Sequence, residues 1–415
     1  MEDNFEKIMG NKSVCGSKWA WSTISLQNGT TASCHRTWKD QITPETLHTF
    51  HNTPIKIKTR QLMLDGKWPD YGCEYCQYIE NAGAVSDRLE SNELITGKFL
   101  PPEILNNPIA THVSPTIVEV YFSNLCNMSC IYCSDRYSTV WEQENIKYND
   151  PARSDITPIN SKEYAAMVTA FFAWLDKNIS SLAELNVLGG EPFFQPELDT
   201  VIEFIESHPS PNLSLKVFSN LKVSQPKLSK ILSKLEQFVV DKKLESVELI
   251  ASLDCWGPEQ EYIRTGLSLH QWENNFSFVV KNYQNVKIHI HSTITCLTIP
   301  TVTGLLEKIN YYNDFRLHDD IIYSADFVVY PQYLSPMIFP MGYFDKFYDD
   351  MSAISTDSQS AKLQGRKDTI NASPYRPDLI VELKQFLDTL DSRRNTNWRS
   401  VFPWLDEFDV DNYRI

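Results

Sequence analysis

The sequence predicts an α/β fold: a partial (β/α)6 barrel of the TIM type with a small cysteine-rich α+β domain before it. Three observations lead to this prediction. Strand-like runs alternate with amphipathic segments through the middle of the chain, as βα units require. Polar residues and cysteines follow the strand-like runs, where barrel enzymes place their chemistry. Four of the nine cysteines lie in the first 80 residues, outside the βα repeats.

The βα repeats are identified from runs rich in β-branched and aromatic residues, each followed by a segment of helical periodicity. Six strands and five intervening helices are predicted in this way. The strands are expected near residues 116–123, 184–188, 213–218, 247–253, 286–296 and 321–330, and the helices near 162–177, 195–207, 226–240, 269–283 and 301–312. A further amphipathic helix is predicted at 377–394, and residues 134–155 are weakly periodic, which is typical of a lid or an exposed loop.

Composition limits the class of protein. The chain has 415 residues, 42% of them hydrophobic, which suffices for a large core without disulfide bonds. We find no apolar run long enough to cross a membrane and no signal peptide, so we expect a soluble, cytoplasmic protein with no membrane partner. The net charge of −15 argues against a nucleic-acid partner. Nine cysteines in such a chain favour metal or redox chemistry over disulfides.

Three cysteines lie within eight residues, in the segment NLCNMSCIYCS, directly after the first predicted barrel strand. Cys126, Cys130 and Cys133 have the spacing C-x3-C-x2-C. A closed zinc site needs four ligands, whereas three thiolates in one loop can hold three irons of a cubane cluster and leave the fourth iron open. A zinc loop completed by a distant cysteine remains the alternative.

This loop, with Tyr132 before the last cysteine, resembles the signature of the radical S-adenosylmethionine (SAM) superfamily. The resemblance implies a [4Fe–4S] cluster on Cys126, Cys130 and Cys133, with SAM bound to its open iron. It also implies that an electron from the cluster cleaves SAM to a 5′-deoxyadenosyl radical, which abstracts hydrogen from the substrate. Tyr132 is then expected near the adenine.

Further strand ends extend the resemblance. Gly189-Gly190-Glu191-Pro192 matches the GGEP element of the superfamily, which implies that this segment holds the SAM ammonium group. The next strands end at Ser219-Asn220 and at Ser252-Leu253-Asp254, and Arg264 follows ten residues after Asp254. By the same resemblance Ser219, Asn220, Ser252, Asp254 and Arg264 are expected to contribute to SAM binding, with Arg264 suited to a carboxylate. An N-cap or turn is the alternative for Ser219 and Asn220, and a solvated helix charge for Arg264.

The four N-terminal cysteines form a second set. Cys15 and Cys34 lie on the arms of a predicted hairpin with Asn28-Gly29 at its turn, and Cys73-x2-Cys76 opens a predicted helix. On spacing alone a structural zinc ion is favoured. The segment also resembles twitch or SPASM auxiliary-cluster modules, which implies a second [4Fe–4S] cluster. Such a module usually follows the barrel, whereas here it precedes it. His35 is expected to be a turn residue rather than a ligand.

The remaining two cysteines are isolated. Cys255 follows Asp254 and is either a hydrogen-atom donor that quenches a substrate radical or a small apolar residue that fills the strand end. Cys296 is expected to pack within a strand. From these positions we predict an auxiliary domain over residues 1–99, a linker over 100–115, the barrel over 116–335 and a helical extension over 336–415.

The resemblance implies an enzyme that activates a C–H bond, with a peptide or protein residue as the expected substrate. The outcome would be crosslinking, epimerisation or oxidation, and a flavodoxin or ferredoxin would be the external electron donor. Two alternatives remain open at this point. One is radical dehydrogenation of a small molecule such as a sugar or aminoglycoside. The other is a non-catalytic iron–sulfur or zinc protein.

Overall fold

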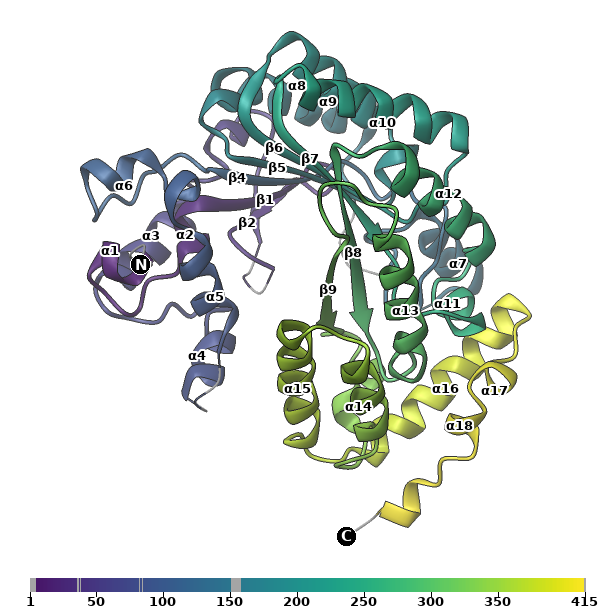
Figure 1. Cartoon of the computed structure of the whole chain (residues 1–415). Coiled ribbons are helices and arrows are strands. Elements are labelled where there is room, and N and C mark those ends of the chain that lie inside the picture. Colours follow the sequence, from purple (N-terminus) through teal and green to yellow (C-terminus); the bar gives the residue numbers. More distant parts are fainter. Residues whose placement is uncertain are drawn as a thin grey trace. The chain divides into compact units, whose positions relative to one another are not determined.

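A computed structural model describes residues 5–413 apart from residues 36, 38, 82, 84 and 151–157. The chain divides into two compact units. Unit 1 comprises Met1–Leu125, Pro151–Phe218 and Lys230–Glu248, and unit 2 comprises Cys126–Asp150, Ser219–Ser229 and Leu249–Ile415. Figure 1 labels most of the helices and strands of both units.

Unit 1 is built on a mixed sheet. Its strands are β1 (Trp21–Ser25), β2 (Thr30–Ala32), β3 (Asp40–Gln41), β4 (Ile117–Tyr121), β5 (Glu184–Leu188), β6 (Ser210–Ser219) and the first half of β7 (Leu244–Ser252). The strand order is β3-β2-β1-β4-β5-β6-β7. Strands β1, β4, β5 and β6 are parallel, whereas β2 and β3 pair antiparallel. The structure is therefore of the mixed α/β class with a parallel core.

The helices of unit 1 cover one face of this sheet and form the N-terminal segment. They are α1 (Phe5–Met9), α2 (Gly16–Ala20), α3 (Pro54–Leu64), α4 (Glu74–Asn81), α5 (Asp87–Leu94), α6 (Pro102–Asn106), α8 (Ser161–Asn178), α9 (Pro196–Ser207) and most of α10 (Gln225–Val240). Asn160 caps α8 by accepting from the Glu163 amide. Phe171 of α8 packs edge to face on Phe122, which follows β4, at 5.7 Å. The even-numbered side chains of β4 therefore face the helices.

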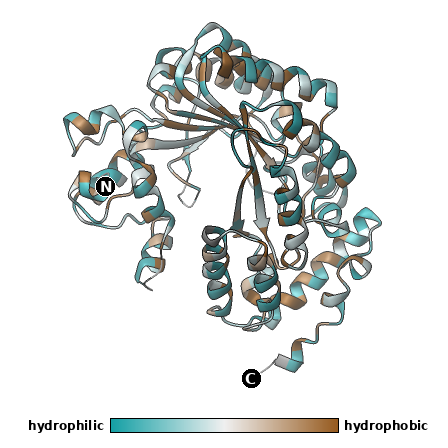
Figure 2. Ribbon diagram, in the orientation of Figure 1, coloured by the Kyte–Doolittle hydropathy of each residue, from teal (hydrophilic) through white to brown (hydrophobic). Residues whose placement is uncertain are grey.

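Unit 2 contains the second half of β7 and the parallel pair β8 (Val286–Ile294) and β9 (Ile322–Phe327). Its helices are α7 (Thr139–Tyr148), α11 (Pro258–Ile263), α12 (Leu269–Asn282), α13 (Val302–Asn313), α14 (Asp345–Ala353), α15 (Asp357–Asn371), α16 (Pro377–Arg394), α17 (Trp398–Val401) and α18 (Pro403–Asp406). Figure 2 shows the brown, apolar residues that run along the strands.

The predicted strands and helices of the βα region are confirmed, each displaced by a few residues at most, and so is the helix at 377–394. The hairpin is also confirmed, with Thr23 opposite Ala32 and with Gly29 at a φ of +58°. The placement of Cys15 on one of its arms was wrong, because Cys15 is the N-cap residue of helix α2, which precedes β1. One pairing was not predicted: β1 lies parallel to β4, with Trp21 beside Ile117. The hairpin therefore belongs to the sheet of unit 1. The predicted domain boundaries stay predictions.

Residues 134–155 were expected to form a lid or an exposed loop, and Thr139–Tyr148 within them form helix α7, so the exposed loop was wrong there and the lid stays a prediction. Ser138 caps this helix, and Asn149 ends it in the left-handed conformation, with a φ of +49°. Buried Trp141 donates its indole N–H to the carbonyl oxygen of Cys130 at 2.7 Å. Glu144 of the same helix forms an ion pair with Arg394 at 3.0 Å, so α7 is held by polar contacts as well as by Trp141. Residues 151–155 of that predicted segment lie outside the described residues.

Candidate functional site

Within unit 1, the glycine-rich segment after β5 lies directly against the chain that follows β4. The amide of Gly190 donates to the Ser123 carbonyl oxygen and that of Glu191 to the Leu125 carbonyl oxygen, both at 2.9 Å. The side-chain amide of Gln195 donates to the same Ser123 oxygen at 3.0 Å. A Cβ atom at Gly190 would lie 2.4 Å from the Leu125 oxygen, and one at Gly189 would lie 2.8 Å from the Ser123 oxygen. Both positions therefore require glycine.

Glu191 lies at the start of a short 3-10 helix, Pro192–Phe194. Its side chain is only 1% exposed and accepts from the Phe193 amide at 3.1 Å. The close approach made possible by the glycines is to the chain itself, at the residues just before Cys126. This segment thus fixes the backbone from which the cysteine loop departs.

Within unit 2, the cysteine loop is held by backbone hydrogen bonds. The Ser129 and Ile131 amides donate to the carbonyl oxygens of Thr265 and Ile263, at 3.0 and 2.9 Å. The Ser138 hydroxyl, from the N-cap of α7, donates to the Met128 carbonyl oxygen at 2.5 Å. The loop that carries Cys126, Cys130 and Cys133 is therefore held by hydrogen bonds at Met128, Ser129 and Ile131.

The three thiols of this loop are partly buried and form no disulfide. Burial raises the pKa of Cys133, and the neighbouring Cys130 and Cys126 raise it further. Burial also raises the pKa of Cys130. Thiolates this close repel one another unless a cation lies among them, and metal ligation requires the deprotonated form. The donor set therefore fits a group that supplies strong positive charge, as the irons of a cluster do.

The N-terminal cysteines are brought together in unit 1. Cys15 and Cys73 are buried in the apolar core that contains Trp19 and Met63. Burial raises the pKa of Cys15 to about 12, and Cys34, Cys73 and Cys76 are near enough to raise it too, although Lys18 lowers it.

The Lys18 ammonium group donates to the Cys34 sulfur at 3.7 Å. Burial lowers the pKa of Lys18, but the thiol groups of Cys34, Cys73 and Cys15 raise it, and the net shift is upward. The thiols of Cys34, Cys73 and Cys15 therefore lie near one buried ammonium group. His35 lies in a turn and is exposed, and its Nε2 is 3.6 Å from Glu119 Oε2.

In the part of the chain that the structure describes, no group of three His, Cys, Asp or Glu side chains converges on a point that could hold one metal ion. The cysteines of an iron–sulfur cluster differ in this respect, because they bind different irons. The two cysteine sets fit iron–sulfur clusters in two respects. Their donors are thiols, and the thiols of each set lie close enough to raise one another's pKa.

Asp254 and Arg264 form a buried ion pair in unit 2. Arg264 Nε and Nη2 donate to Asp254 Oδ2 and Oδ1 at 2.8 and 2.9 Å. The Tyr132 hydroxyl donates to Asp254 Oδ2 at 2.7 Å, and the guanidinium carbon lies 5.6 Å from the Tyr132 ring centre. The Thr293 amide donates to Asp254 Oδ1 at 2.9 Å. Asp254 thus holds both Tyr132 and Arg264 in place.

This arrangement affects the predicted role of Arg264. Burial lowers the pKa of Arg264, but Asp254, Tyr132 and Cys130 together outweigh that effect, and the net shift is upward. Two nitrogen atoms of the guanidinium group already donate hydrogen bonds to Asp254. The carboxylate that Arg264 binds in this structure is therefore that of Asp254, a residue of the protein itself. The predicted contacts of Arg264 and Tyr132 with SAM stay predictions.

The turn after β6 contacts the cysteine loop through the predicted site residue Asn220 and through Asn127 and Lys222, which the sequence did not single out. Asn220 Nδ2 donates to Asn127 Oδ1 at 2.9 Å, and Asn127 Nδ2 donates to the Lys222 carbonyl oxygen at 2.8 Å. The Lys222 ammonium group donates to the Asn127 carbonyl oxygen at 3.0 Å. Asn127 therefore anchors the loop between Cys126 and Cys130. The sequence signal that could have identified Asn127 is its position between the candidate ligands Cys126 and Cys130.

The other predicted site residues are placed as follows. The Ser219 hydroxyl accepts from the amide of Leu221, whose φ is +53°, so Ser219 forms part of a turn. Ser252 is half-buried at the end of β7. Cys255 is fully buried, and its amide donates to Gln260 Oε1 at 2.9 Å. Cys296 is fully buried as well. Burial raises the pKa of Cys255 and of Cys296.

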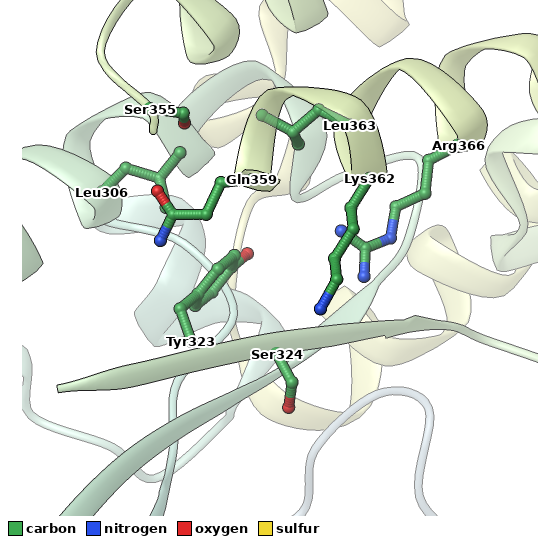
Figure 3. Close-up of a pocket in the computed structure, with 8 residues that line it drawn as sticks. All are labelled: Leu306, Tyr323, Ser324, Ser355, Gln359, Lys362, Leu363 and Arg366. Carbon is green, nitrogen blue, oxygen red and sulfur yellow. The ribbon is translucent and has the colours of Figure 1, made fainter. Parts of the chain in front are cut away.

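A small cavity of about 50 Å³ lies elsewhere in unit 2, between β9 and α15. Figure 3 shows Gln359, Lys362 and Arg366 extending from α15 toward Tyr323 on β9. Arg366 donates to the carbonyl oxygen of Ala325 at 2.5 Å. None of the predicted site residues lines this cavity, and its volume suits water or a small ion rather than a substrate.

No family model matches the chain, and no curated protein matches it. Among solved structures, SuiB of Streptococcus suis bound to S-adenosylmethionine is 12% identical, with a TM-score of 0.36 over 75% of this chain and 62% of that chain. SuiB without that ligand is 11% identical, with the same TM-score and coverage. TYW1 with a lysine-pyruvate adduct is 17% identical, with a TM-score of 0.27 over 50% of this chain and 62% of that chain.

The chain thus spans less than two thirds of the length of these structures. Across the described residues, no helix is both long and apolar enough to span a bilayer.

Proposed function

We propose that the chain is a radical SAM enzyme. The observation that carries the proposal is the cysteine loop C-x3-C-x2-C after β4, together with the GGEP segment after β5. The two segments are connected by the hydrogen bond from the Glu191 amide to the carbonyl oxygen of Leu125, the residue before Cys126. A loop that merely packed on the surface would need neither the two obligatory glycines nor the three thiols.

Cys126, Cys130 and Cys133 would hold the first [4Fe–4S] cluster, which supplies the electron that cleaves bound SAM to the hydrogen-abstracting 5′-deoxyadenosyl radical. The chain's own residues keep the loop in one conformation. Asn127 anchors the loop between the first two cysteines, and Asp254 orients Tyr132 and Arg264.

The GGEP segment, Ser219, Asn220, Ser252 and Arg264 are proposed to orient SAM. Glu191 is suited to an ammonium group because the residue is buried, and a charge-assisted hydrogen bond is stronger in such surroundings than in water.

Cys15, Cys34, Cys73 and Cys76 are proposed to hold a second [4Fe–4S] cluster, with zinc as the alternative. Lys18, buried beside them, balances part of the negative charge that four thiolates would bring. The proposed substrate is a peptide or protein residue, and the proposed electron donor is a flavodoxin or ferredoxin. Dehydrogenation of a small molecule such as a sugar or aminoglycoside is the alternative reaction, and a non-catalytic iron–sulfur or zinc protein is the alternative class.

The test is metal and SAM binding by matched cysteine variants, purified without oxygen after reconstitution with iron and sulfide. The triple variant Cys126→Ala, Cys130→Ala, Cys133→Ala should retain about half of the iron and lose SAM binding in equilibrium dialysis. Cys296→Ala removes a buried thiol that belongs to neither cysteine set, and it should leave the iron content and SAM binding unchanged. Full iron content in the triple variant would overturn the assignment of the loop.

A further inference from the structure

A row of polar side chains crosses the sheet of unit 1, on the face opposite the helices. Thr23 on β1 pairs in register with Glu119 on β4, Glu119 with Asn186 on β5, and Asn186 with Lys216 on β6. Figure 1 shows β1, β4 and β5 side by side in this order. Residues in register on parallel strands project to the same face, and Phe122 shows that the other face of β4 meets α8.

Three acceptors of this row are buried without hydrogen bonds. Glu119 and Asn186 are each only 3% exposed, yet Glu119 Oε1 and Asn186 Oδ1 have no partner among the described residues. The same holds for Thr23 Oγ1 on the adjoining strand. Burying an unsatisfied polar atom destabilises a fold, and a carboxylate oxygen more than most, so three neighbouring ones point to a bound group.

The neighbours of Asn186 fix which atom remains unsatisfied. Asn186 Nδ2 donates to Glu184 Oε1 at 2.9 Å. A flipped amide would place its oxygen against that carboxylate, so Oδ1 must be the atom without a partner. Trp21 Nε1, on the same strand and face as Thr23, is also buried without a partner in the described part of the chain.

The charges on this face leave Glu119 uncompensated. The Lys216 ammonium group lies 2.9 Å from Glu184 and 3.6 Å from Glu248, so its charge is shared between those two carboxylates. Among the described residues, Glu119 has an ion-pair partner only in His35, at 3.6 Å, and the His35 side chain is 62% exposed. A buried carboxylate is stable when it is paired, so this position calls for a cation.

We infer that Thr23, Glu119 and Asn186 bind a primary ammonium group of a ligand. Its three N–H donors match the three acceptors, and its charge compensates that of Glu119. A water molecule offers only two donors and no charge. A guanidinium group binds a carboxylate through both oxygens, and Glu119 Oε2 is directed toward His35. The absence of a convergent metal-binding group among the described residues favours an organic cation.

The ligand is assigned as the substrate, which rests on the proposed function, because Glu119 lies on the strand that leads to Cys126. A lysine side chain or terminus of a peptide and an amino sugar share the ammonium group. Binding of an amine does not depend on the clusters and can be measured with or without them.

The test is ligand-observed NMR on the full-length protein. The probe n-butylamine represents a lysine side chain, glucosamine represents an amino sugar, and n-butanol is the uncharged control. We expect saturable binding of one or both amines and none of n-butanol. Glu119→Gln should weaken amine binding at least tenfold, and the isosteric Thr23→Val and Asn186→Leu several-fold. Glu245→Gln removes an exposed carboxylate, one paired with Lys98, and should change nothing.

Folding is monitored by thermal denaturation of the same samples. Glu119→Gln should unfold at or above the wild-type temperature, because it removes an uncompensated buried charge. Equal affinity in Glu119→Gln and wild type, equal binding of n-butanol, or no saturable amine binding would each overturn the inference. If Glu119→Gln does not fold, Thr23→Val decides the question. Saturable amine binding in a protein that never cleaves SAM would overturn the proposed function and leave this site standing.

Discussion

Gly190→Ala is the substitution whose effect follows most directly from the geometry. The new Cβ would lie 2.4 Å from the Leu125 oxygen, 2.6 Å from the Leu125 carbonyl carbon and 2.7 Å from the Asn124 oxygen. All three are backbone atoms and cannot rotate away. Because a carbon–oxygen contact is normally about 3.3 Å or longer, either the segment at Gly190 or the segment at Leu125 must move by about 1 Å.

Such a shift is enough to break the hydrogen bonds from Gly190 and Glu191, which are 2.9 Å long. Overpacking costs about 1–3 kcal/mol, and each lost hydrogen bond costs about 1 kcal/mol. We therefore expect the free energy of unfolding to fall by about 2–4 kcal/mol, together with a loss of SAM binding. Urea denaturation measures the first quantity and equilibrium dialysis the second.

The matched control is Gly365→Ala, because Gly365 lies inside α15 with no atom within 4 Å of an added Cβ. It should stabilise the chain by up to about 1 kcal/mol through helix propensity. The prediction would be refuted if Gly190→Ala still bound SAM and its free energy of unfolding lay within about 0.5 kcal/mol of the wild-type value. Such a small change is typical of surface substitutions and incompatible with a backbone clash.

Two further predictions concern buried charges. Asp254→Asn leaves Arg264 buried without its counter-charge and should cost about 3 kcal/mol in urea denaturation, and the double variant with Arg264→Met should cost less than the sum of the singles. An additive result would contradict coupling. Burial, with help from Arg60 and Lys56, holds the pKa of His51 well below 6.5, so below pH 6.5 only the unfolded chain takes up the proton. The free energy of unfolding should therefore decrease as the pH is lowered below 6.5, by up to about 1.4 kcal/mol per pH unit. His51→Gln should lose this pH dependence, and an unchanged dependence in the variant would contradict the prediction.

The strands and helices of the βα region could be predicted because their signal is local. TIVEVYFS is apolar enough to identify β4, and the periodicity of residues 162–177 is enough to identify α8. The parallel pairing of β1 with β4 could not be predicted, since nearly a hundred residues separate Trp21 from Ile117 and nothing local specifies the partner.

The site was predictable where a motif carried it and not where side chains meet across the fold. The three cysteines and the two glycines are read directly from spacing, whereas the contact of Asn127 with Asn220 depends on two loops. Glu119 and Asn186 gave a weak local signal, each being a polar residue inside an apolar strand. Their register, which places them side by side, exists only in the sheet.

Cleavage of SAM tests the central claim most directly. The protein is reconstituted with iron and sulfide without oxygen, given SAM and dithionite, and 5′-deoxyadenosine is quantified by chromatography. We predict that it forms with the wild-type chain and is lost in Cys126→Ala, while Cys296→Ala still forms it. Fully loaded protein that binds SAM and yields no 5′-deoxyadenosine, with n-butylamine or glucosamine present to occupy the proposed ammonium site, would contradict the assignment.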